Sequence, residues 1–390
     1  MIVVSNDRIY YSLVVALICS AVAVRIISLP AIADDMPNFY LPWYNYIVDH
    51  GGFLALKYNI GLYTPPNYYL LAAVSYLNGS VKTLYLIKSV PMIFDLISAF
   101  IIYRLIRLHY GEGRPATLSA LVFLNLPAVV LEGVYWGQYD IIFVTFMLST
   151  ALALLEGKTK LALVWFGVAV SFKLPAVFLL PLIAILVLNR RISLLELFIS
   201  PLAYLAMMLP AILVGRPFFE TLLVYFHQFD YAQLLVEDAP NPYVIAKRLH
   251  FLTYKAGVAI GLVVAMSSTV GAIFLLRSRI VMTSARRLLL GAAFFTTLAP
   301  YLLPKMHDRY IFSGDVFAFA YTAVTPRAWP LVVLFEAATL LAYSKVLWWF
   351  HHGPDFGLIP MTGAMLLLIA LIWQTPASTE ERTRAGIRLG

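Results

Sequence analysis

The chain has 390 residues, of which 62% are hydrophobic and only 12% are charged. Its mean hydropathy of +0.84 is far above what a water-soluble domain can expose without aggregating. These values exclude a cytosolic enzyme, a single-span receptor and a coiled coil, and the continuous apolar stretches argue against a barrel. The net charge of +8 comes from scattered basic residues, which indicate membrane topology and not a nucleic-acid partner.

Apolar runs separated by charged residues, Pro or Gly predict an all-α, polytopic transmembrane helical bundle with about twelve spans. The runs lie at about 10–31, 84–108, 115–133, 138–156, 161–172, 173–188, 194–214, 254–277, 286–303, 309–326, 329–346 and 356–374. The fifth and sixth are short for full spans and could form one broken hairpin around Lys173 and Pro175. The only cysteine, Cys19, excludes an internal disulfide and a cysteine metal site.

The basic residues also predict an orientation. More than half of the 28 lie in the short loops on the side of Arg8, so this side should be cytoplasmic. Two long segments, 32–83 and 215–253, then face outward, and we call them the first and second long loops. We expect a multi-pass plasma or inner membrane protein with its functional site on the external, periplasmic face. The sequence Ala31-Ile32-Ala33 resembles a signal-peptidase site, so the first helix is either cleaved before Asp34 or kept as an anchor.

The first long loop begins with two carboxylates, Asp34 and Asp35, shortly before Pro37. The apolar spacing after Pro37 predicts an amphipathic helix along the membrane surface. One Asp could cap this helix, or it could serve as a general base whose pKa is raised by partial desolvation. Most of the loop's aromatic rings are interpreted as an interfacial belt, while Tyr63, before paired prolines, is a candidate for stacking on a sugar or an isoprenoid.

Two further polar clusters lie in the middle of the chain. A short turn between predicted spans carries Trp136, Gln138 and Asp140. Gln138 and Asp140 either cap the next helix or bind sugar hydroxyls. Lys173 lies where an apolar helix is broken, and a lysine at membrane depth indicates function unless its side chain extends to the interface.

The last cluster contains Lys305, His307, Asp308 and Arg309. It combines two fixed cations, an imidazole and a carboxylate within five positions. A salt-bridged loop would explain this composition. A phosphate or diphosphate clamp is the sharper hypothesis, because Arg offers a planar fork and Lys a point charge to an oxyanion.

Taken in order, these motifs resemble the GT-C superfamily of integral-membrane glycosyltransferases. They are Asp34-Asp35-Met36, Tyr63-Thr64-Pro65-Pro66, Trp136-Gly137-Gln138-Tyr139-Asp140, Phe172-Lys173-Leu174-Pro175 and Lys305-Met306-His307-Asp308-Arg309-Tyr310. The sequence is most similar to bacterial members that resemble dolichyl-phosphate-hexose-dependent mannosyl- and glucosyltransferases. The resemblance extends over residues 10–320, and segment 239–251 matches the family's Asn-rich loop only loosely.

The resemblance implies inverting transfer of a hexose, mannose or glucose, from a polyprenyl-phosphate carrier to a lipid-linked or cell-envelope glycan acceptor on the external leaflet. In that family an Asp of the first external loop is the base, and Asp35 is the better match, with Asp34 second. Lys305, His307 and Arg309 match a family motif that has Glu where Asp308 stands. No cofactor is expected, although a transiently bound divalent metal stays open.

We expect residues 1–253 to form the transmembrane catalytic module with both long loops, and residues 254–390 to complete the lipid-donor site. The rival interpretation is a membrane transporter or a lipid-linked sugar flippase. Charged residues within predicted spans, namely Asp95, Lys173, Asp315 and Glu336, would suit that function. Transport sites lie near the bilayer midplane, whereas the polar clusters here lie at the predicted external ends of spans.

Overall fold

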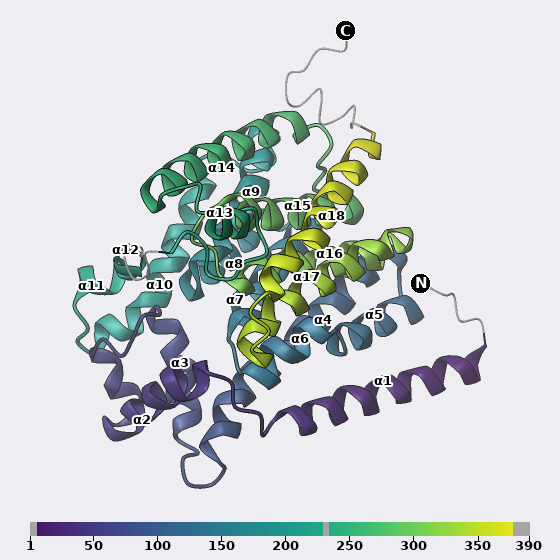
Figure 1. Ribbon diagram of the computed structural model, residues 1–390. Helices are drawn as coiled ribbons and strands as arrows, with labels where there is room; N and C mark the ends of the chain where they lie inside the picture. Colours follow the sequence, from purple (N-terminus) through teal and green to yellow (C-terminus); the bar gives the residue numbers. More distant parts are fainter. Residues whose placement is uncertain (1–5, 229–233, 377–390) are drawn as a thin grey trace.

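The computed structural model describes residues 6–228 and 234–376, and these residues form a helical bundle without β-strands (Figure 1). This confirms the predicted all-α class. The α-helices are α1 (Asp7–Ser28), α2 (Leu41–Asp49), α3 (Pro65–Ser75), α4 (Thr83–Tyr110), α5 (Arg114–Leu124), α6 (Pro127–Val130), α7 (Asp140–Leu155), α8 (Thr159–Phe172), α9 (Leu180–Leu188), α10 (Ile199–Leu213), α11 (Phe218–Leu222), α12 (Val224–Gln228), α13 (Tyr243–Leu249), α14 (Tyr254–Leu276), α15 (Ala285–Leu302), α16 (Phe312–Val324), α17 (Trp329–Trp348) and α18 (Gly353–Gln374). The 3-10 and π-helical turns are η1 (Met36–Tyr40), η2 (Gly52–Lys57), η3 (Leu131–Trp136), η4 (Leu174–Leu179), η5 (Glu196–Phe198), η6 (Asp308–Ile311) and η7 (Pro326–Ala328).

The chain is a helical membrane protein, but the count of twelve spans is not confirmed. Each of the twelve predicted runs contains helix. Within the described residues, however, only six helices are long and apolar enough to cross a bilayer, or seven if the pair Arg114–Leu124 and Pro127–Trp136, bent by 49°, forms one broken span. Helices α7 and α8 and the segment Leu174–Leu188 are apolar but too short to meet this criterion. The sequence pattern located the helices, but the breaks between them shorten the continuous spans.

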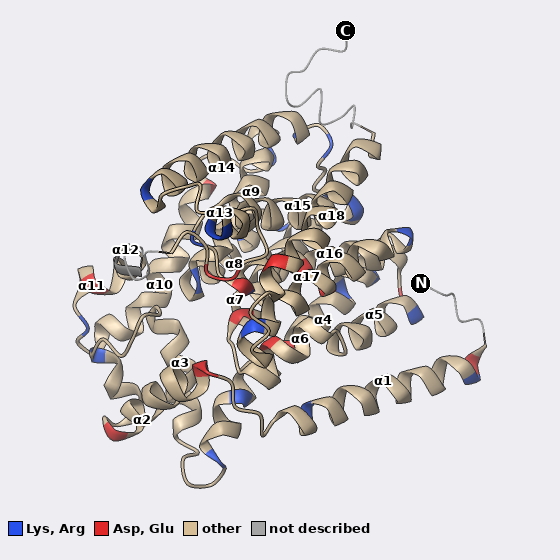
Figure 2. Ribbon diagram, in the orientation of Figure 1, with Lys and Arg blue, Asp and Glu red and all other residues tan. Residues whose placement is uncertain are grey.

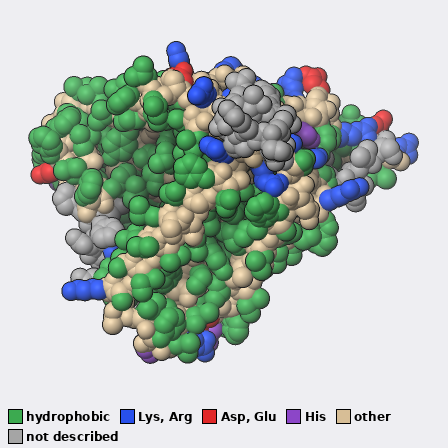
Figure 3. Space-filling view, turned by 90° about the horizontal axis from the view of Figure 1, so that it is seen from above, with side chains coloured by type: hydrophobic (Ala, Val, Ile, Leu, Met, Phe, Trp, Pro, Cys, Tyr) green, Lys and Arg blue, Asp and Glu red, His purple; other side chains and the backbone are tan. Residues whose placement is uncertain are grey.

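Hydrophobic residues occur in two different surroundings in this bundle, buried in its centre or exposed on its outer helices. Helices α7 and α16 are apolar on nearly all sides and are almost completely buried in its centre. By contrast, α1 buries only Ala21 and Arg25, and many of its apolar side chains are exposed. Figure 3 shows hydrophobic side chains covering much of one face, with charged side chains mainly toward its edges. Figure 2 shows few charges along the long helices and a group of both signs near α7 and α17.

An ion pair fixes the otherwise sparsely packed α1 to the bundle. Arg25 Nη2 lies 2.8 Å from Asp95 Oδ2 of α4, and Arg25 Nη1 donates to the Leu124 carbonyl at 2.8 Å. Both residues are buried. A buried guanidinium without a carboxylate would be strongly destabilising, so this pair holds α1 in place and, with it, the start of the first long loop. Asp95 therefore has a structural role.

The first long loop is largely helical, and its helices pack against the bundle. The helix predicted after Pro37 is present as η1 followed by α2. Tyr40, Tyr44 and Tyr68 are almost completely buried, so these rings form part of the core and not an interfacial belt. The rings of Tyr40 and Tyr68 both pack on Trp43, and Tyr40 also packs on Tyr139 of the bundle. The loop folds back over the bundle, which composition alone does not reveal.

The orientation inferred from the basic residues can be tested by cysteine labelling. Ser80 and Lys160 are exposed at opposite ends of predicted spans, and the native Cys19 is exposed on α1. In a Cys19→Ala background, we expect Ser80→Cys to react with an impermeant maleimide in intact cells, because the positive-inside rule places it outside. Lys160→Cys should react only after the membrane is permeabilised. Labelling of Lys160→Cys alone in intact cells would reverse the orientation.

Candidate active site

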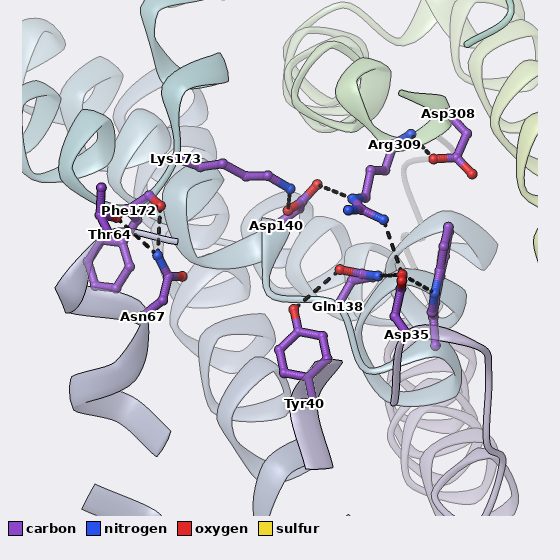
Figure 4. Close-up of polar contacts among 11 residues, drawn as sticks. Asp35, Tyr40, Thr64, Asn67, Gln138, Asp140, Phe172, Lys173, Asp308 and Arg309 are labelled. Carbon is purple, nitrogen blue, oxygen red and sulfur yellow. Dashed lines mark hydrogen bonds and ion pairs between the residues drawn. The ribbon is translucent and has the colours of Figure 1, made fainter. Parts of the chain in front are cut away.

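Asp35 is the centre of a set of converging hydrogen-bond donors (Figure 4). It precedes η1 but makes no side-chain capping bond to it, so the capping interpretation is wrong for this residue. Its Oδ2 atom instead accepts from Trp136 Nε1 at 3.0 Å, from Arg309 Nη1 at 3.2 Å and from Gln138 Nε2. A carboxylate that accepts from three donors is held in one orientation.

The turn between η3 and α7 brings Trp136 and Gln138 to Asp35. Gly137, between them, adopts φ +86°, a left-handed conformation that favours glycine. A Cβ atom there would lie 2.6 Å from Met36 Cε, the end of a flexible side chain that would have to move, so the left-handed φ is the main reason for glycine at this position. Both flanking side chains are buried, and Gln138 Oε1 accepts from the Tyr40 hydroxyl at 3.3 Å. These contacts join the turn to the residues that follow Asp35.

Arg309 links two carboxylates that are far apart in the sequence. Besides the contact of Arg309 with Asp35, its Nε atom lies 3.7 Å from Asp140 Oδ2 (Figure 4). The Cζ atom of its guanidinium lies 5.6 Å from the centroid of the Trp136 ring. Asp140 begins α7 but does not cap it with its side chain. It forms an ion pair with Lys173 instead. Asp35, Asp140, Lys173 and Arg309 therefore form one buried or half-buried charge cluster with equal numbers of cations and carboxylates.

Lys173 lies at a break between helices, at the position where the sequence predicts one. Helix α8 ends at Phe172, whose carbonyl accepts from Asn67 Nδ2 at 2.7 Å, while Thr64 Oγ1 donates to the Ser171 carbonyl at 2.6 Å. Lys173 Nζ then lies 5.6 Å from the ring centre of Tyr63 and 5.3 Å from that of Tyr310. The carboxylate of Asp140 compensates the charge of this buried ammonium.

A second buried lysine, Lys88 of α4, holds the backbone around this cluster. Its ammonium donates to the carbonyls of Ser28 at 3.3 Å, Ala31 at 2.6 Å and Tyr135 at 2.9 Å. These carbonyls belong to the end of α1, the linker before Asp35 and the turn that carries Trp136. Because one ammonium satisfies all three, it fixes the distance between Asp35 and its donors.

His307, Lys305 and Asp34 lie away from this cluster. His307 Nε2 is 3.0 Å from Glu237 Oε2. Burial lowers the pKa of His307, although Glu237 opposes this effect. Lys305 Nζ lies 5.8 Å from the ring centre of Tyr254 on α14, and its backbone N–H donates to the Leu235 carbonyl at 2.9 Å. Asp34 is exposed, and its carbonyl accepts from Asn38 Nδ2 at 2.7 Å.

Sequence reasoning missed two of these positioning groups. The sequence alone could have indicated a role for Lys88, since a lone lysine in an apolar run is costly unless its charge is compensated. It could not have indicated one for Glu237, because only the fold brings the second long loop to His307, with Glu237 N–H donating to the Met306 carbonyl at 3.0 Å and Asp308 N–H donating to the Glu237 carbonyl at 3.0 Å. The ion pairs of His307 and Arg309 thus reach other segments, so residues 305–310 are more than a self-paired loop.

The arrangement offers a carboxylate beside two cations, which suits proton removal next to an oxyanion. Among residues 6–228 and 234–376, no three His, Cys, Asp or Glu side chains are grouped as metal ligands would be. A phosphate could be held by Arg309 and Lys173, whereas the adjacent carboxylates could accept protons or sugar hydroxyls.

Asp308 gives this region a testable pH dependence. The residue is buried, and burial raises its pKa from 3.8 to about 7, although Arg309 opposes the shift. Between these pH values the unfolded chain loses a proton that the folded chain keeps, so the Asp308 contribution to stability falls as pH rises and is constant above about pH 7. Asp308→Asn keeps an oxygen that can accept from the Arg309 backbone N–H, which lies 2.9 Å from Asp308 Oδ1 in the wild type. The substitution removes the free-energy cost of ionising a buried carboxyl group.

We therefore expect Asp308→Asn to raise the melting temperature of the detergent-solubilised protein more at about pH 8 than at about pH 5. Differential scanning fluorimetry at both pH values measures the difference. Exposed Asp49 provides the matched control, and Asp49→Asn should give no such pH-dependent gain. An equal effect of Asp308→Asn at both pH values would contradict the assignment.

The sequence profile of a family described as dolichyl-phosphate-mannose-protein mannosyltransferase matches residues 63–218. This segment is less than half of the chain. It contains the predicted site residues from Tyr63 to Lys173, whereas Asp35 and Arg309 lie outside it. No curated protein matches the chain. The family match supports the resemblance that the order of the motifs indicates, to a glycosyltransferase of the GT-C superfamily.

Proposed function

We propose that the chain is an inverting glycosyltransferase that moves a hexose, mannose or glucose, from a polyprenyl-phosphate carrier to a lipid-linked or cell-envelope glycan acceptor on the external leaflet. The observation that carries this proposal is the position of Arg309, which contacts both Asp35 and Asp140 while Lys173 pairs with Asp140. A base and two cations are the groups that transfer from a phosphate-linked sugar requires.

The proposed reaction needs one base and no general acid. The acceptor oxygen attacks the anomeric carbon, the bond from that carbon to the phosphate oxygen breaks, and the electron pair leaves with the polyprenyl phosphate. The proton of the acceptor hydroxyl moves to Asp35. Arg309 and Lys173 stabilise the negative charge that develops on the departing phosphate. Because the attacking oxygen enters opposite the leaving group, the anomeric configuration inverts.

The ion pair between Arg309 and Asp35 couples donor binding to the base. Three hydrogen bonds, including the one from Arg309 at 3.2 Å, hold the Asp35 carboxylate. A phosphate of the sugar carrier that pairs with Arg309 takes this group away from Asp35, so binding of the carrier changes the surroundings of the base. Asp34, the second candidate for the base, is exposed and has no such arrangement of donors, which favours Asp35.

The other site residues receive supporting roles in this proposal. Trp136 and Gln138 orient Asp35, and Tyr63 flanks Lys173 and offers a ring on which the sugar can stack. Lys305 adds positive charge at the edge of the site, where the His307 ring pairs with Glu237. Residues from both proposed parts of the chain, 1–253 and 254–390, are needed, because Arg309 lies in the second part.

The rival transporter interpretation gains less support from the buried charges. Asp95 pairs with Arg25, Asp315 Oδ2 accepts from Thr339 Oγ1 at 2.9 Å, and Glu336 Oε2 accepts from the Ala128 N–H at 3.0 Å. Each of these contacts joins neighbouring helices. Purified protein incubated with a polyprenyl-phosphate hexose and a glycolipid acceptor should release polyprenyl phosphate, with or without EDTA. A protein that moves the donor across vesicles but releases no polyprenyl phosphate would instead be a flippase.

Arg309→Lys tests the phosphate clamp. The substitution keeps the positive charge but loses the fork that reaches two groups at once, so we expect the transfer rate to fall by about one to two orders of magnitude. Transfer of a radiolabelled hexose measures the rate. Arg107→Lys is the matched control, since Arg107 is exposed at the far end of α4 from Lys88 and should keep full activity. Normal transfer by Arg309→Ala would contradict the clamp.

Asp35→Asn tests the base. The asparagine keeps an oxygen that can accept from Trp136 and Arg309 but cannot take up a proton, so we expect at least about a hundredfold loss in transfer rate with donor binding retained. Asp34→Asn is the matched control, and its effect should be much smaller. Loss of transfer in Asp34→Asn with normal transfer in Asp35→Asn would exchange the two roles, and normal transfer in both would refute the mechanism.

A further inference from the structure

A second polar site lies beside the candidate active site, where α13 meets the junction of α17 and α18. A cavity of about 240 Å³ there is lined by the basic side chains of Lys247, Arg248 and Lys345. We call it the basic pocket. Figure 2 shows the basic residues of α13 and the acidic stretch of the preceding segment close together in the middle of the view. None of these residues takes part in the proposed transfer.

Fixed positive charge exceeds negative charge in the basic pocket. Two carboxylates face the three cations: Asp238 lies 2.6 Å from Lys345 Nζ and 4.0 Å from Lys247 Nζ, and Asp355 lies 3.2 Å from Arg248 Nη1. The side chains of Lys247 and Arg248 are 47% and 61% exposed. Ion pairs this exposed are worth little, so both cations can turn toward an incoming anion at small cost.

The backbone adds to this positive potential. Helix α18 has 22 residues and begins at Gly353, beside the pocket residue Pro354, and no side chain caps its first turn. The positive end of its helix dipole therefore lies at the pocket, where the carboxylate of Asp355 in the first turn offsets part of it. Together with the excess of cations and the cavity, this arrangement favours an anion with several oxygen acceptors, which is the chemistry of a phosphate group.

The surroundings of the pocket are apolar and exposed. Trp349, Phe350 and Phe356, at the α17–α18 junction, are 69%, 45% and 51% exposed, and Leu249 at the end of α13 is 65% exposed. Helices α17 and α18 belong to the segments that are long and apolar enough to cross a bilayer. Exposed aromatic side chains at the ends of such helices are typical of the membrane interface, the depth at which lipid phosphates lie.

We propose that the basic pocket binds the phosphate group of a membrane lipid. The cations and the end of α18 hold the phosphate, and the exposed rings contact the acyl chains of the lipid. This site goes beyond the proposed transfer and does not depend on it. The pocket also adjoins the candidate active site, because its Asp238 directly follows Glu237, the partner of His307. A lipid bound there would lie next to the segment that holds residues 305–308.

Binding of acyl-labelled phosphatidic acid to the full chain in detergent tests this proposal. Diacylglycerol with the same labelled chain lacks only the phosphate. By fluorescence anisotropy we expect phosphatidic acid to bind at least about tenfold more tightly than diacylglycerol, and the difference to shrink at high salt. The double variant Lys247→Ala/Arg248→Ala should weaken phosphatidic acid binding by about tenfold or more. These side chains are exposed, so their removal leaves the bundle packing intact.

Lys82→Ala/Lys255→Ala removes the same charge from exposed positions outside the pocket and should bind phosphatidic acid like the wild type. Unchanged binding by the pocket variant would overturn the proposal, as would an equal loss in this control. Inorganic phosphate that competes as effectively as unlabelled phosphatidic acid would also overturn it, because the site would then recognise the free anion. Since the readout is binding, a failure of the proposed transfer would leave this result unaffected.

Discussion

The guanidinium of Arg309, whose side chain is only 13% exposed, is the constraint on which the candidate site depends. A buried cation is tolerated only when carboxylates compensate it, and removing one partner of such a group is strongly destabilising. Arg309 obtains this compensation from Asp35, just after α1, and from Asp140, at the start of α7. Compensation of the positive charge of Arg309 therefore brings together residues from the beginning, the middle and the last third of the chain.

The supporting contacts act mainly on the backbone. Lys88 holds three carbonyls around Asp35, and Thr64 and Asn67 hold the two carbonyls that precede Lys173. Farther out, the pair of Arg25 and Asp95 fixes α1, which has few other buried residues. Polar groups at this depth have no water to satisfy them, so each contact is specific and costly to break. In this way a helix exposed along most of its length still positions Asp35.

The candidate site combines residues from inside and outside the segment that matches the family. Residues 63–218 match the mannosyltransferase family and supply Asp140 and Lys173, whereas Asp35 and Arg309 come from outside that segment. The second long loop also contributes, since Glu237 pairs with His307 and Asp238 lines the basic pocket. A sugar carrier with a phosphate and a membrane lipid with a phosphate would therefore bind to adjoining parts of one surface, which the second long loop connects.

The sequence by itself determined the helical membrane class and the identity of most charged site residues. Long apolar runs can satisfy their backbone groups in lipid only as helices, and a charge among them is too costly to be without a role. Only the tertiary structure decided which charges meet. Asp35 lies 274 positions from Arg309, and its neighbour Asp34, which has the same side chain, is exposed. The count of twelve spans is not confirmed for a related reason. Breaks such as the one at Lys173 are stabilised by contacts from other segments, here from Thr64 and Asn67, which hydropathy does not record.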